Sequence, residues 1–223
     1  MATPRRFISI EGVDGAGKST HLDFIADFLT SNGHDVLRTR EPGGTPAGER
    51  LREVLLSQSM TPTTELMLMF AARSEHVETV ILPALRAGRT VLSDRFTDSS
   101  RAYQVAGKGV HPNILWNLET LTCPIAPALT LIFDVPPEVA RSRMHGRELD
   151  RFEAEGADFH ARVREAYRDL ARTEPDRVRL IDANRPIATI RRDLAAHLAE
   201  FAVQFPPSSS KQRAREAERA SRP

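Results

Sequence analysis

The sequence predicts an α/β protein with a parallel sheet of about five strands and helices on both faces of that sheet. Short runs rich in β-branched and aromatic residues alternate with longer segments of helical period, which is typical of parallel strands joined by crossover helices. The chain has 223 residues, of which 40% are hydrophobic and 27% are charged. This balance is typical of a globular protein with one sizeable core.

Five segments are expected to be the strands: residues 6–11, 35–40, 90–94, 129–135 and 178–182. Between the first two, Leu22, Ile25 and Leu29 recur at helical spacing, and Gly33 supplies a stop. Residues 63–86 predict a long helix because they are rich in helix formers, and Pro83 is expected to kink its last turn. A helix from residue 187 to about 201 closes the predicted domain.

Charged residues dominate two later segments. Four arginines fall within eleven positions, namely Arg141, Arg143, Arg147 and Arg151. By composition alone this run indicates a solvated helical face with ion pairs. Residues 206–223 carry five basic and two acidic side chains among serines and prolines, which predicts a disordered basic tail. We interpret this tail as a solubilising extension rather than a weak nucleic-acid contact, and expect one domain over residues 1–205.

The overall composition argues against several functional classes. Lysine and arginine (31 residues) balance aspartate and glutamate (30 residues), so no global basic field indicates nucleic acid as a specific partner. No run approaches the roughly 20 apolar residues that span a bilayer, and the first residues do not resemble a signal peptide. The single Cys123 rules out an intramolecular disulfide, and the seven histidines show no metal-ligand spacing. We therefore expect a cytoplasmic protein without a membrane partner.

The stretch "EGVDGAGKST", residues 11–20, predicts a phosphate site. The pattern G-x-x-x-x-G-K-[ST] is met by Gly12, Gly17, Lys18 and Ser19, between a predicted strand and a predicted helix. Glycines let backbone N–H groups surround phosphate oxygens, Lys18 reaches the terminal phosphates, and Ser19 offers a hydroxyl to Mg²⁺. The residues expected to bind a nucleoside triphosphate are Gly12, Val13, Asp14, Gly15, Ala16, Gly17, Lys18, Ser19 and Thr20. The loop alone does not distinguish a switch, a motor and a kinase, and in it Asp14 could be a turn residue.

A second constellation, "SDRFTDSSRAYQ" at residues 93–104, begins where a predicted strand ends. Ligands bind at the carboxyl ends of strands in open parallel sheets. Asp94 and Arg95 can serve Mg²⁺ and a second phosphate there. Polar groups suited to a sugar and a base follow: Ser99, Ser100, Tyr103 and Gln104. From the residues alone, a helix-capping role for the serines stays equally open.

These motifs together resemble thymidylate kinase. The phosphate loop, "TREPGGTPAGERLR", "FAARSEHV", "DRFTDSSRAYQ" and "GRELDRFE" occur in the order and spacing of that family, over roughly residues 5–203. The resemblance implies a P-loop nucleoside monophosphate kinase fold and ATP-dependent phosphorylation of dTMP to dTDP with Mg²⁺. It also implies a homodimer in the cytosol.

The resemblance assigns roles to individual residues. Asp14 would face the 3′-hydroxyl of dTMP, Arg95 would bind the dTMP phosphate, and Arg73 would read the thymine ring. Asp94 would lie near Mg²⁺, directly or through water, together with Ser19. Further positions around the monophosphate are matched by Glu41, Arg52, Ser99, Ser100, Tyr103 and Gln104.

The segment at about 141–156 resembles the lid that closes over ATP. The phosphate loop carries Gly15 where one class of these kinases has an arginine. In the bacterial class with glycine at that place, a lid arginine supplies the missing charge, and the matching residue is Arg151. The catalytic residues implied are therefore Asp14, Lys18, Arg95 and Arg151, with Arg147 as a weaker candidate four residues earlier.

Three positions depart from the family pattern. Phe96 follows the Asp–Arg pair where the family commonly has Tyr or His. The aromatic residue that stacks on thymine has two candidate counterparts, Met69 and Phe70, which lie on nearly the same helical face. Arg147 stands where glycine is frequent. Two other functions stay as alternatives: a kinase for another nucleoside monophosphate or a deoxynucleoside, and a nucleotide-dependent interaction module.

Overall fold

Five parallel strands form one sheet in the computed structural model, which describes residues 6–146 and 150–208. The strands are β1 (Phe7–Glu11), β2 (Val36–Arg40), β3 (Thr90–Asp94), β4 (Leu129–Asp134) and β5 (Val178–Asp182). Their order in the sheet is β2-β3-β1-β4-β5. The predicted fold class is confirmed, and each strand end lies within one residue of its expected position.

The central strand β1 places the functional loops. Every residue of β1 is buried, and Ile10 lies beside Asp94 of β3 and Leu131 of β4. Because the strands are parallel, their carboxyl ends meet at one edge of the sheet. The loop after β1 and the segment after Asp94 therefore lie side by side at that edge.

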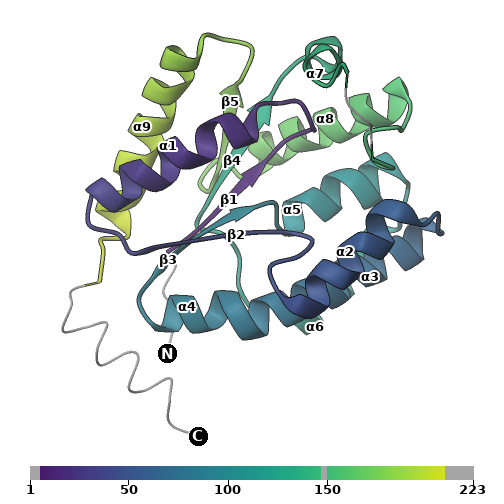
Figure 1. Cartoon of the computed structure of the whole chain (residues 1–223), viewed down its shortest axis with the longest axis horizontal. Coiled ribbons are helices and arrows are strands. Elements are labelled where there is room, and N and C mark those ends of the chain that lie inside the picture. Colours follow the sequence, from purple (N-terminus) through teal and green to yellow (C-terminus); the bar gives the residue numbers. More distant parts are fainter. Residues whose placement is uncertain (1–5, 147–149, 209–223) are drawn as a thin grey trace, which may run out of the picture.

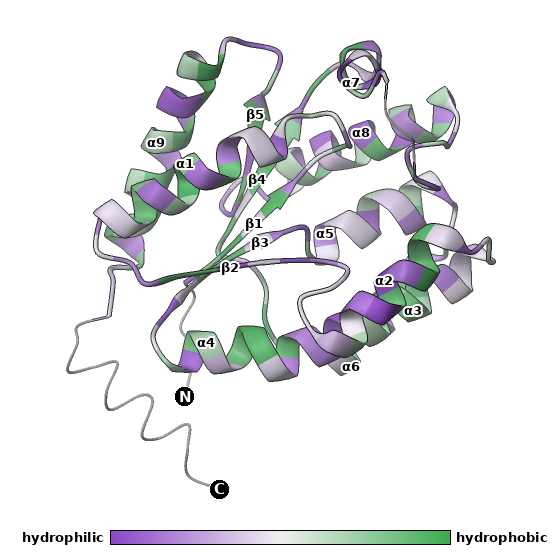
Figure 2. Cartoon of the chain, viewed as in Figure 1, coloured by the Kyte–Doolittle hydropathy of each residue, from purple (hydrophilic) through white to green (hydrophobic). Residues whose placement is uncertain are grey.

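Helices cover both faces of the sheet (Figure 1). On one face, α1 (Lys18–Ser31) packs against α9 (Ile187–Gln204). On the other lie α3 (Pro62–His76), α4 (Leu82–Arg86), α5 (Thr97–Ser100) and α8 (Ala157–Thr173). Around these pack α2 (Pro46–Ser57), α6 (Pro112–Thr122) and α7 (Pro137–Arg143). In Figure 2 the strand β1 shows an apolar stretch and β2 ends in polar residues, whereas the helices alternate apolar and polar stretches.

The long helix expected over residues 63–86 is interrupted by a wider turn. Helix α3 continues through a π-helical turn, η1 (Val77–Ile81), into α4. Pro83 is the second residue after this turn; proline lacks an N–H and crowds the carbonyl group four residues earlier. A wider turn relieves that crowding. A second π-helical turn, η2 (Arg101–Gly107), continues from α5 and carries the predicted base and sugar residues Tyr103 and Gln104.

The lid segment is only partly helical. Residues 137–143 form α7, but residues 151–155 form turns before α8 begins at Ala157. A continuous helical face through Arg143 and Arg151 is therefore wrong. Arg147 lies outside the described residues, as does most of the predicted tail, residues 209–223. The expectation of a single domain over residues 1–205 stays a prediction.

We predict that Gly12→Ala destabilises the protein. Gly12 has φ 131°, and a Cβ atom there would lie 2.5 Å from the carbonyl oxygen of Phe133 on β4. The strain and the clash should lower the free energy of unfolding by about 2 kcal/mol or more. This corresponds to a melting temperature lower by roughly 4–8 °C. The measurement is thermal unfolding without nucleotide. Gly156→Ala is the matched control, because no contact within 4 Å of its Cβ position is found among the residues that the structure describes. Equal melting temperatures for the two variants would contradict this prediction.

Candidate active site

The loop between β1 and α1 has the geometry of a phosphate cradle. Gly12, Gly15 and Gly17 have φ values of 131°, 78° and 92°, which favour glycine. A Cβ atom on Gly15 would lie 2.3 Å from the carbonyl oxygen of Ala140, so the backbone of α7 comes close to the loop. Helix α1 then begins at Lys18, and its free N–H groups and positive dipole end face the same space.

A hollow of about 570 Å³ opens at this cradle. Its lining residues are Asp14, Gly15, Gly17, Lys18, Ser19, Thr20, Asp94, Arg143, Met144 and Glu153. The Nζ atom of Lys18 donates to the carbonyl oxygens of Gly12 and Val13 at 2.9 and 3.0 Å. Burial and the nearby charge of Arg95 lower the pKa of Lys18. We call this space the donor cavity.

A second hollow lies on the other side of Asp14, and we call it the acceptor cavity. It brings together every residue expected around the monophosphate except Phe70: Asp14, Glu41, Arg52, Met69, Arg73, Arg95, Ser99, Ser100, Tyr103 and Gln104. It is also lined by Pro42, Leu56, Asp150 and Phe152. Residues from the phosphate loop, the segment after β2, α2, α3, the segment after β3 and the lid therefore converge on one space next to the phosphate cradle.

Arg95 and Asp14 form an ion pair between the two cavities. The Nη2 atom of Arg95 donates to Oδ1 of Asp14 at 2.7 Å and to the hydroxyl of Tyr103 at 3.3 Å. Burial opposes ionisation of Asp14, but the charges of Arg95 and Lys18 outweigh it and lower the pKa of Asp14. Asp14 is therefore a carboxylate at neutral pH, held between one cation on each side.

Arg95 itself has an uncommon backbone conformation. Its φ of 71° lies in the left-handed region, which costs free energy for a residue with a side chain. Neighbouring bonds hold it there: its N–H donates to the carbonyl oxygen of Ile10 at 2.9 Å, and its own carbonyl oxygen accepts from the Ser93 hydroxyl at 2.8 Å. This conformation directs the guanidinium group toward the acceptor cavity.

Arg73 is fixed by a buried network at the base of the acceptor cavity. Its Nε donates to Oε2 of Glu41 at 2.6 Å, and its Nη1 donates to the Ser100 hydroxyl at 3.1 Å. The other oxygen of Glu41 lies 3.0 Å from Nδ1 of His76, whose Nε2 lies 2.6 Å from the Thr39 hydroxyl. Arg73, Glu41 and His76 are all buried and hydrogen-bonded, so the position of the guanidinium group is well determined.

The structure separates the two candidates for the stacking residue. Met69 lines the acceptor cavity. Phe70 is 1% exposed and packs in the core with Leu66 and Leu115, beneath the guanidinium group of Arg73 at 4.5 Å. Phe96 is also buried, with its ring 4.8 Å from that of Phe7. The ring of Phe96 therefore serves the core.

Asp94 and Ser19 could hold a divalent cation. Both line the donor cavity. Oδ1 of Asp94 is buried, yet among the residues that the structure describes it has no hydrogen-bond partner. A buried carboxylate oxygen without a donor, next to a hydroxyl group and a phosphate cradle, suits Mg²⁺, which uses one or two protein oxygens together with substrate phosphates.

Comparisons with known proteins agree with this geometry. A family model for thymidylate kinases matches residues 10–194. The thymidylate kinase of Thiobacillus denitrificans is 50% identical over 203 residues, which cover 90% of this chain and 100% of that protein. That of Chromobacterium violaceum is 51% identical over 197 residues, 86% of this chain and 93% of that protein.

The chain belongs to the thymidylate kinase family. Its fold also resembles the crystal structure of the thymidylate kinase from Ehrlichia chaffeensis, with a TM-score of 0.70 and 31% identity over 86% of this chain and 97% of that one. Across the described ranges, no helix is both long and apolar enough to cross a membrane.

Glu11 is a buried site residue that the sequence analysis missed. It ends β1 and is fully buried. Its Oε1 accepts the N–H of Phe96 at 2.8 Å, and its Oε2 accepts the hydroxyls of Ser99 and Tyr167 at 2.6 and 2.7 Å. Burial and the nearby charge of Asp98 raise the pKa of Glu11 to about 7. In the sequence, a glutamate just before the phosphate loop is predicted only as the last residue of a strand. No local signal therefore indicates that it accepts hydrogen bonds from distant residues.

Arg143 and Arg151, two arginines of the charged run, lie in different surroundings. Arg143 lines the donor cavity: its Nη1 lies 3.4 Å from the carbonyl oxygens of Gly15 and Ala16, and its Nη2 donates to that of Ala183 at 3.0 Å. Arg151 instead pairs with Glu65 at 2.6 Å, outside that cavity. In the sequence, Arg143 is one arginine of a charged run and shows no separate signal.

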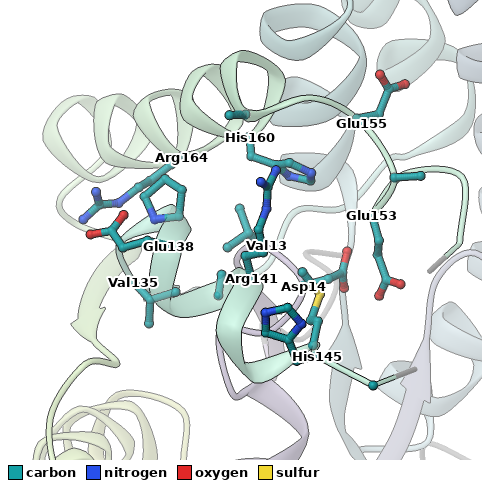
Figure 3. A pocket seen from close by; sticks show the side chains of 16 residues that line it. Val13, Asp14, Val135, Glu138, Arg141, His145, Glu153, Glu155, His160 and Arg164 are labelled. Atoms are coloured by element: carbon teal, nitrogen blue, oxygen red, sulfur yellow. The ribbon is translucent and has the colours of Figure 1, made fainter. Parts of the chain in front are cut away.

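A third hollow, of about 510 Å³, lies between α7 and α8 (Figure 3). In Figure 3, Glu138 and Arg164 stand on one side of it, and Glu153 and Glu155 of the lid segment stand on the other. Asp14 borders this hollow as well as the other two. The lid residues after 149 therefore border all three spaces of the site.

We predict that Glu11→Gln changes how stability depends on pH. Because the pKa of Glu11 is raised from 4.5 to about 7, the unfolded chain releases this proton in that window while the native state retains it. The stability that Glu11 contributes is thus complete below pH 4.5 and is lost as pH rises to about 7. Glutamine cannot ionise, so the free energy of unfolding of the variant should rise relative to that of wild type by on the order of 3 kcal/mol across this window. Urea unfolding from pH 4.5 to pH 8 measures this, and a difference that does not change with pH would refute it.

Proposed function

We propose that this chain transfers the γ-phosphoryl group of ATP to dTMP, forming ADP and dTDP. An oxygen of the dTMP phosphate attacks the γ-phosphorus, and the bond from that phosphorus to the β–γ bridging oxygen breaks. The observation that carries this proposal is the shared border of the two cavities. A phosphate cradle and an arginine-lined cavity meet at Asp14, so two phosphate-bearing ligands would lie end to end.

The donor cavity suits ATP. Backbone N–H groups from Gly12 to Thr20 and the ammonium group of Lys18 would bind its phosphates. Ser19 and Asp94 would hold Mg²⁺, which neutralises phosphate charge when bound. A cation site of this kind uses the unpaired oxygen of Asp94 described above.

The acceptor cavity suits a deoxynucleoside monophosphate. Arg95 and Arg52 supply positive charge for its phosphate, and Arg73 presents hydrogen-bond donors toward its base. The hydroxyl of Tyr103 lies 3.4 Å from Oδ2 of Asp14. At this place the tyrosine ring would leave little room for the 2′-hydroxyl of a ribonucleotide. Asp14 would then accept from the 3′-hydroxyl, which accounts for a carboxylate within a phosphate loop.

Catalysis requires positioning and charge stabilisation rather than a strong base, because the acceptor is already an anion. The family resemblance predicts that Arg151 covers the transferring group, and this stays a prediction. Within residues 6–146 and 150–208, Arg143 is the lid arginine that lines the donor cavity. We propose Arg143 as an additional phosphate-facing group, and Arg147 stays a weaker candidate.

We also propose that the chain forms a homodimer. Helices α3 and α6 pack together and expose large apolar side chains: Met67 is 53% exposed, Trp116 64% and Leu121 80%. Such side chains are common at interfaces between protein chains. The mass in solution, against 24.8 kDa for one chain, tests this proposal. A cytoplasmic location stays a prediction.

The purified protein with Mg²⁺ and ATP should form ADP in proportion to added dTMP, at a rate at least about 100-fold above that with dCMP or dGMP, because a base-reading site discriminates strongly. A coupled ADP assay measures this. Faster turnover of another nucleotide or a deoxynucleoside would favour the alternative kinase, and ADP release that needs no acceptor would favour a nucleotide-dependent interaction module.

Arg143→Ala should lower kcat by about 100-fold or more with little change in dTMP affinity, because a guanidinium group would be lost from the transferring phosphoryl group. Steady-state kinetics with both substrates measures this. Arg38→Ala is the control, since Arg38 is exposed on β2 and pairs with Asp23. A wild-type kcat for Arg143→Ala would exclude this additional role for Arg143 and leave Arg151 and Arg147 as the candidates.

A further inference from the structure

Glu65 is a buried carboxylate that the proposed reaction does not use. It lies in the first turn of α3 and its side chain is fully buried. Its Oε1 accepts from Nε2 of Gln104 at 2.9 Å. Its Oε2 lies 2.9 Å from Nζ of Lys108 and 2.6 Å from Nη1 of Arg151. A buried charge without partners is strongly unfavourable, so this carboxylate depends on the two cations beside it.

Arg151 is held on two sides of its guanidinium group. While Nη1 pairs with Glu65, Nε and Nη2 donate to the carbonyl oxygen of Leu55 at 3.0 and 2.8 Å. Leu55 lies in the last turn of α2, where carbonyl groups lack helical partners and the helix dipole attracts cations. Arg151 therefore joins the lid segment to the end of α2 and to the beginning of α3.

Lys108 completes the network at the other end of the segment. Its Nζ lies 3.0 Å from Oε1 of Glu155 as well as beside Glu65. Two cations, Lys108 and Arg151, thus face two carboxylates, Glu65 and Glu155. The network is neutral as a whole, and it fastens residues 150–155 near both ends.

The fastened segment forms one wall of the acceptor cavity. Asp150 and Phe152 both line that cavity. Oδ1 of Asp150 accepts the N–H groups of Phe152 and Glu153 at 2.8 and 2.9 Å, so the turn is one compact unit. The ring of Phe152 meets the ring of Tyr103 edge-on at 6.1 Å. Because Arg151 stands between two wall residues in the chain, its attachment to Glu65 determines where that wall lies.

We propose that Glu65 is a positioning residue that holds this wall in place through Arg151 and thereby sets the affinity of the acceptor cavity for its nucleoside monophosphate. The proposal rests on the proposed function. Glu65 does not line the cavity, but Gln104, which its other oxygen holds, does. One buried carboxylate therefore aligns two parts of the cavity lining, one from η2 and one from the lid segment.

The test compares three variants of the full chain: Glu65→Gln, Arg151→Ala and the double variant. Glutamine keeps an acceptor for Gln104 but removes the charge opposite Arg151. Each single variant should weaken dTMP binding, measured by titration calorimetry, by about tenfold, because the ion pair that joins Arg151 to Glu65 is lost and the wall is no longer held there. The double variant should bind dTMP no more than about twofold more weakly than whichever single variant binds it less tightly. Each single variant already removes the same interaction, so the second substitution adds little. For Glu65→Gln at saturating dTMP, kcat and the KM for ATP should stay within about threefold of wild type, because Glu65 lines neither the acceptor cavity nor the donor cavity.

Two further variants separate this role from general stability. Arg151→Lys keeps a charge for Glu65 but loses the paired bonds to Leu55, so it should restore part of the dTMP affinity. Arg172→Ala is the matched control, since Arg172 pairs with Glu165 and Asp169 on the surface of α8 and should leave dTMP affinity unchanged. If Glu65→Gln does not fold, the alanine and lysine variants of Arg151 decide the question alone.

Other outcomes would overturn the proposal. Additive losses in the double variant would mean that Glu65 and Arg151 act separately. A large loss of kcat in Arg151→Ala with wild-type dTMP affinity would place Arg151 on the transferring phosphoryl group instead. Failure of the proposed function is distinct from both, because the wild-type protein itself would then form no ADP in response to dTMP.

Discussion

The carboxyl group of Glu11 joins the central strand to the elements that carry the site. It ends β1 and binds the N–H of Phe96, the hydroxyl of Ser99 and the hydroxyl of Tyr167. Phe96 directly follows Arg95, whose left-handed backbone needs support from both sides. The sheet edge, the arginine of the acceptor cavity and helix α8 are therefore held by one buried group, and its burial excludes the water that would compete for these bonds.

Asp14 separates the two cavities electrostatically. Its carboxylate repels the phosphates of both ligands, and the cations on either side of it compensate: Lys18 toward the donor and Arg95 toward the acceptor. A phosphate that approached Arg95 would compete with Asp14 for the same guanidinium nitrogens. Repulsion from Asp14 would then direct that phosphate away from the loop carbonyls and toward the line of transfer.

Local patterns predicted much of this molecule. The five strands and the phosphate loop depend on spacing and periodicity over a few residues, and both could be predicted from the sequence. Most of the acceptor cavity could be predicted from the family resemblance, because the motifs are contiguous. The two candidates Met69 and Phe70 could not be separated, since packing of α6 against α3 decides which of them reaches the core.

Interactions between distant segments could not be predicted. Glu11 meets Tyr167 from 156 positions away, and Arg151 meets Leu55 from 96 positions away. In both pairs the sequence shows only an ordinary charged residue in a strand or a charged run. The position of Arg143 at the donor cavity could not be predicted for the same reason. The four arginines of one run look alike in the sequence, and the end of α7 at Arg143 places Arg143 and Arg151 in different surroundings.

The strand order also has a consequence for how the chain acquires its structure. The first strand to be synthesised, β1, is fully buried, and its neighbours are β3 and β4, which begin at residues 90 and 129. This buried strand has no partner until β3, which ends at Asp94, has left the ribosome. Sheets in which paired strands lie far apart in the sequence have a high contact order and form slowly. The central position that makes β1 a rigid base for the active site thus leaves it among the segments most exposed to aggregation during synthesis.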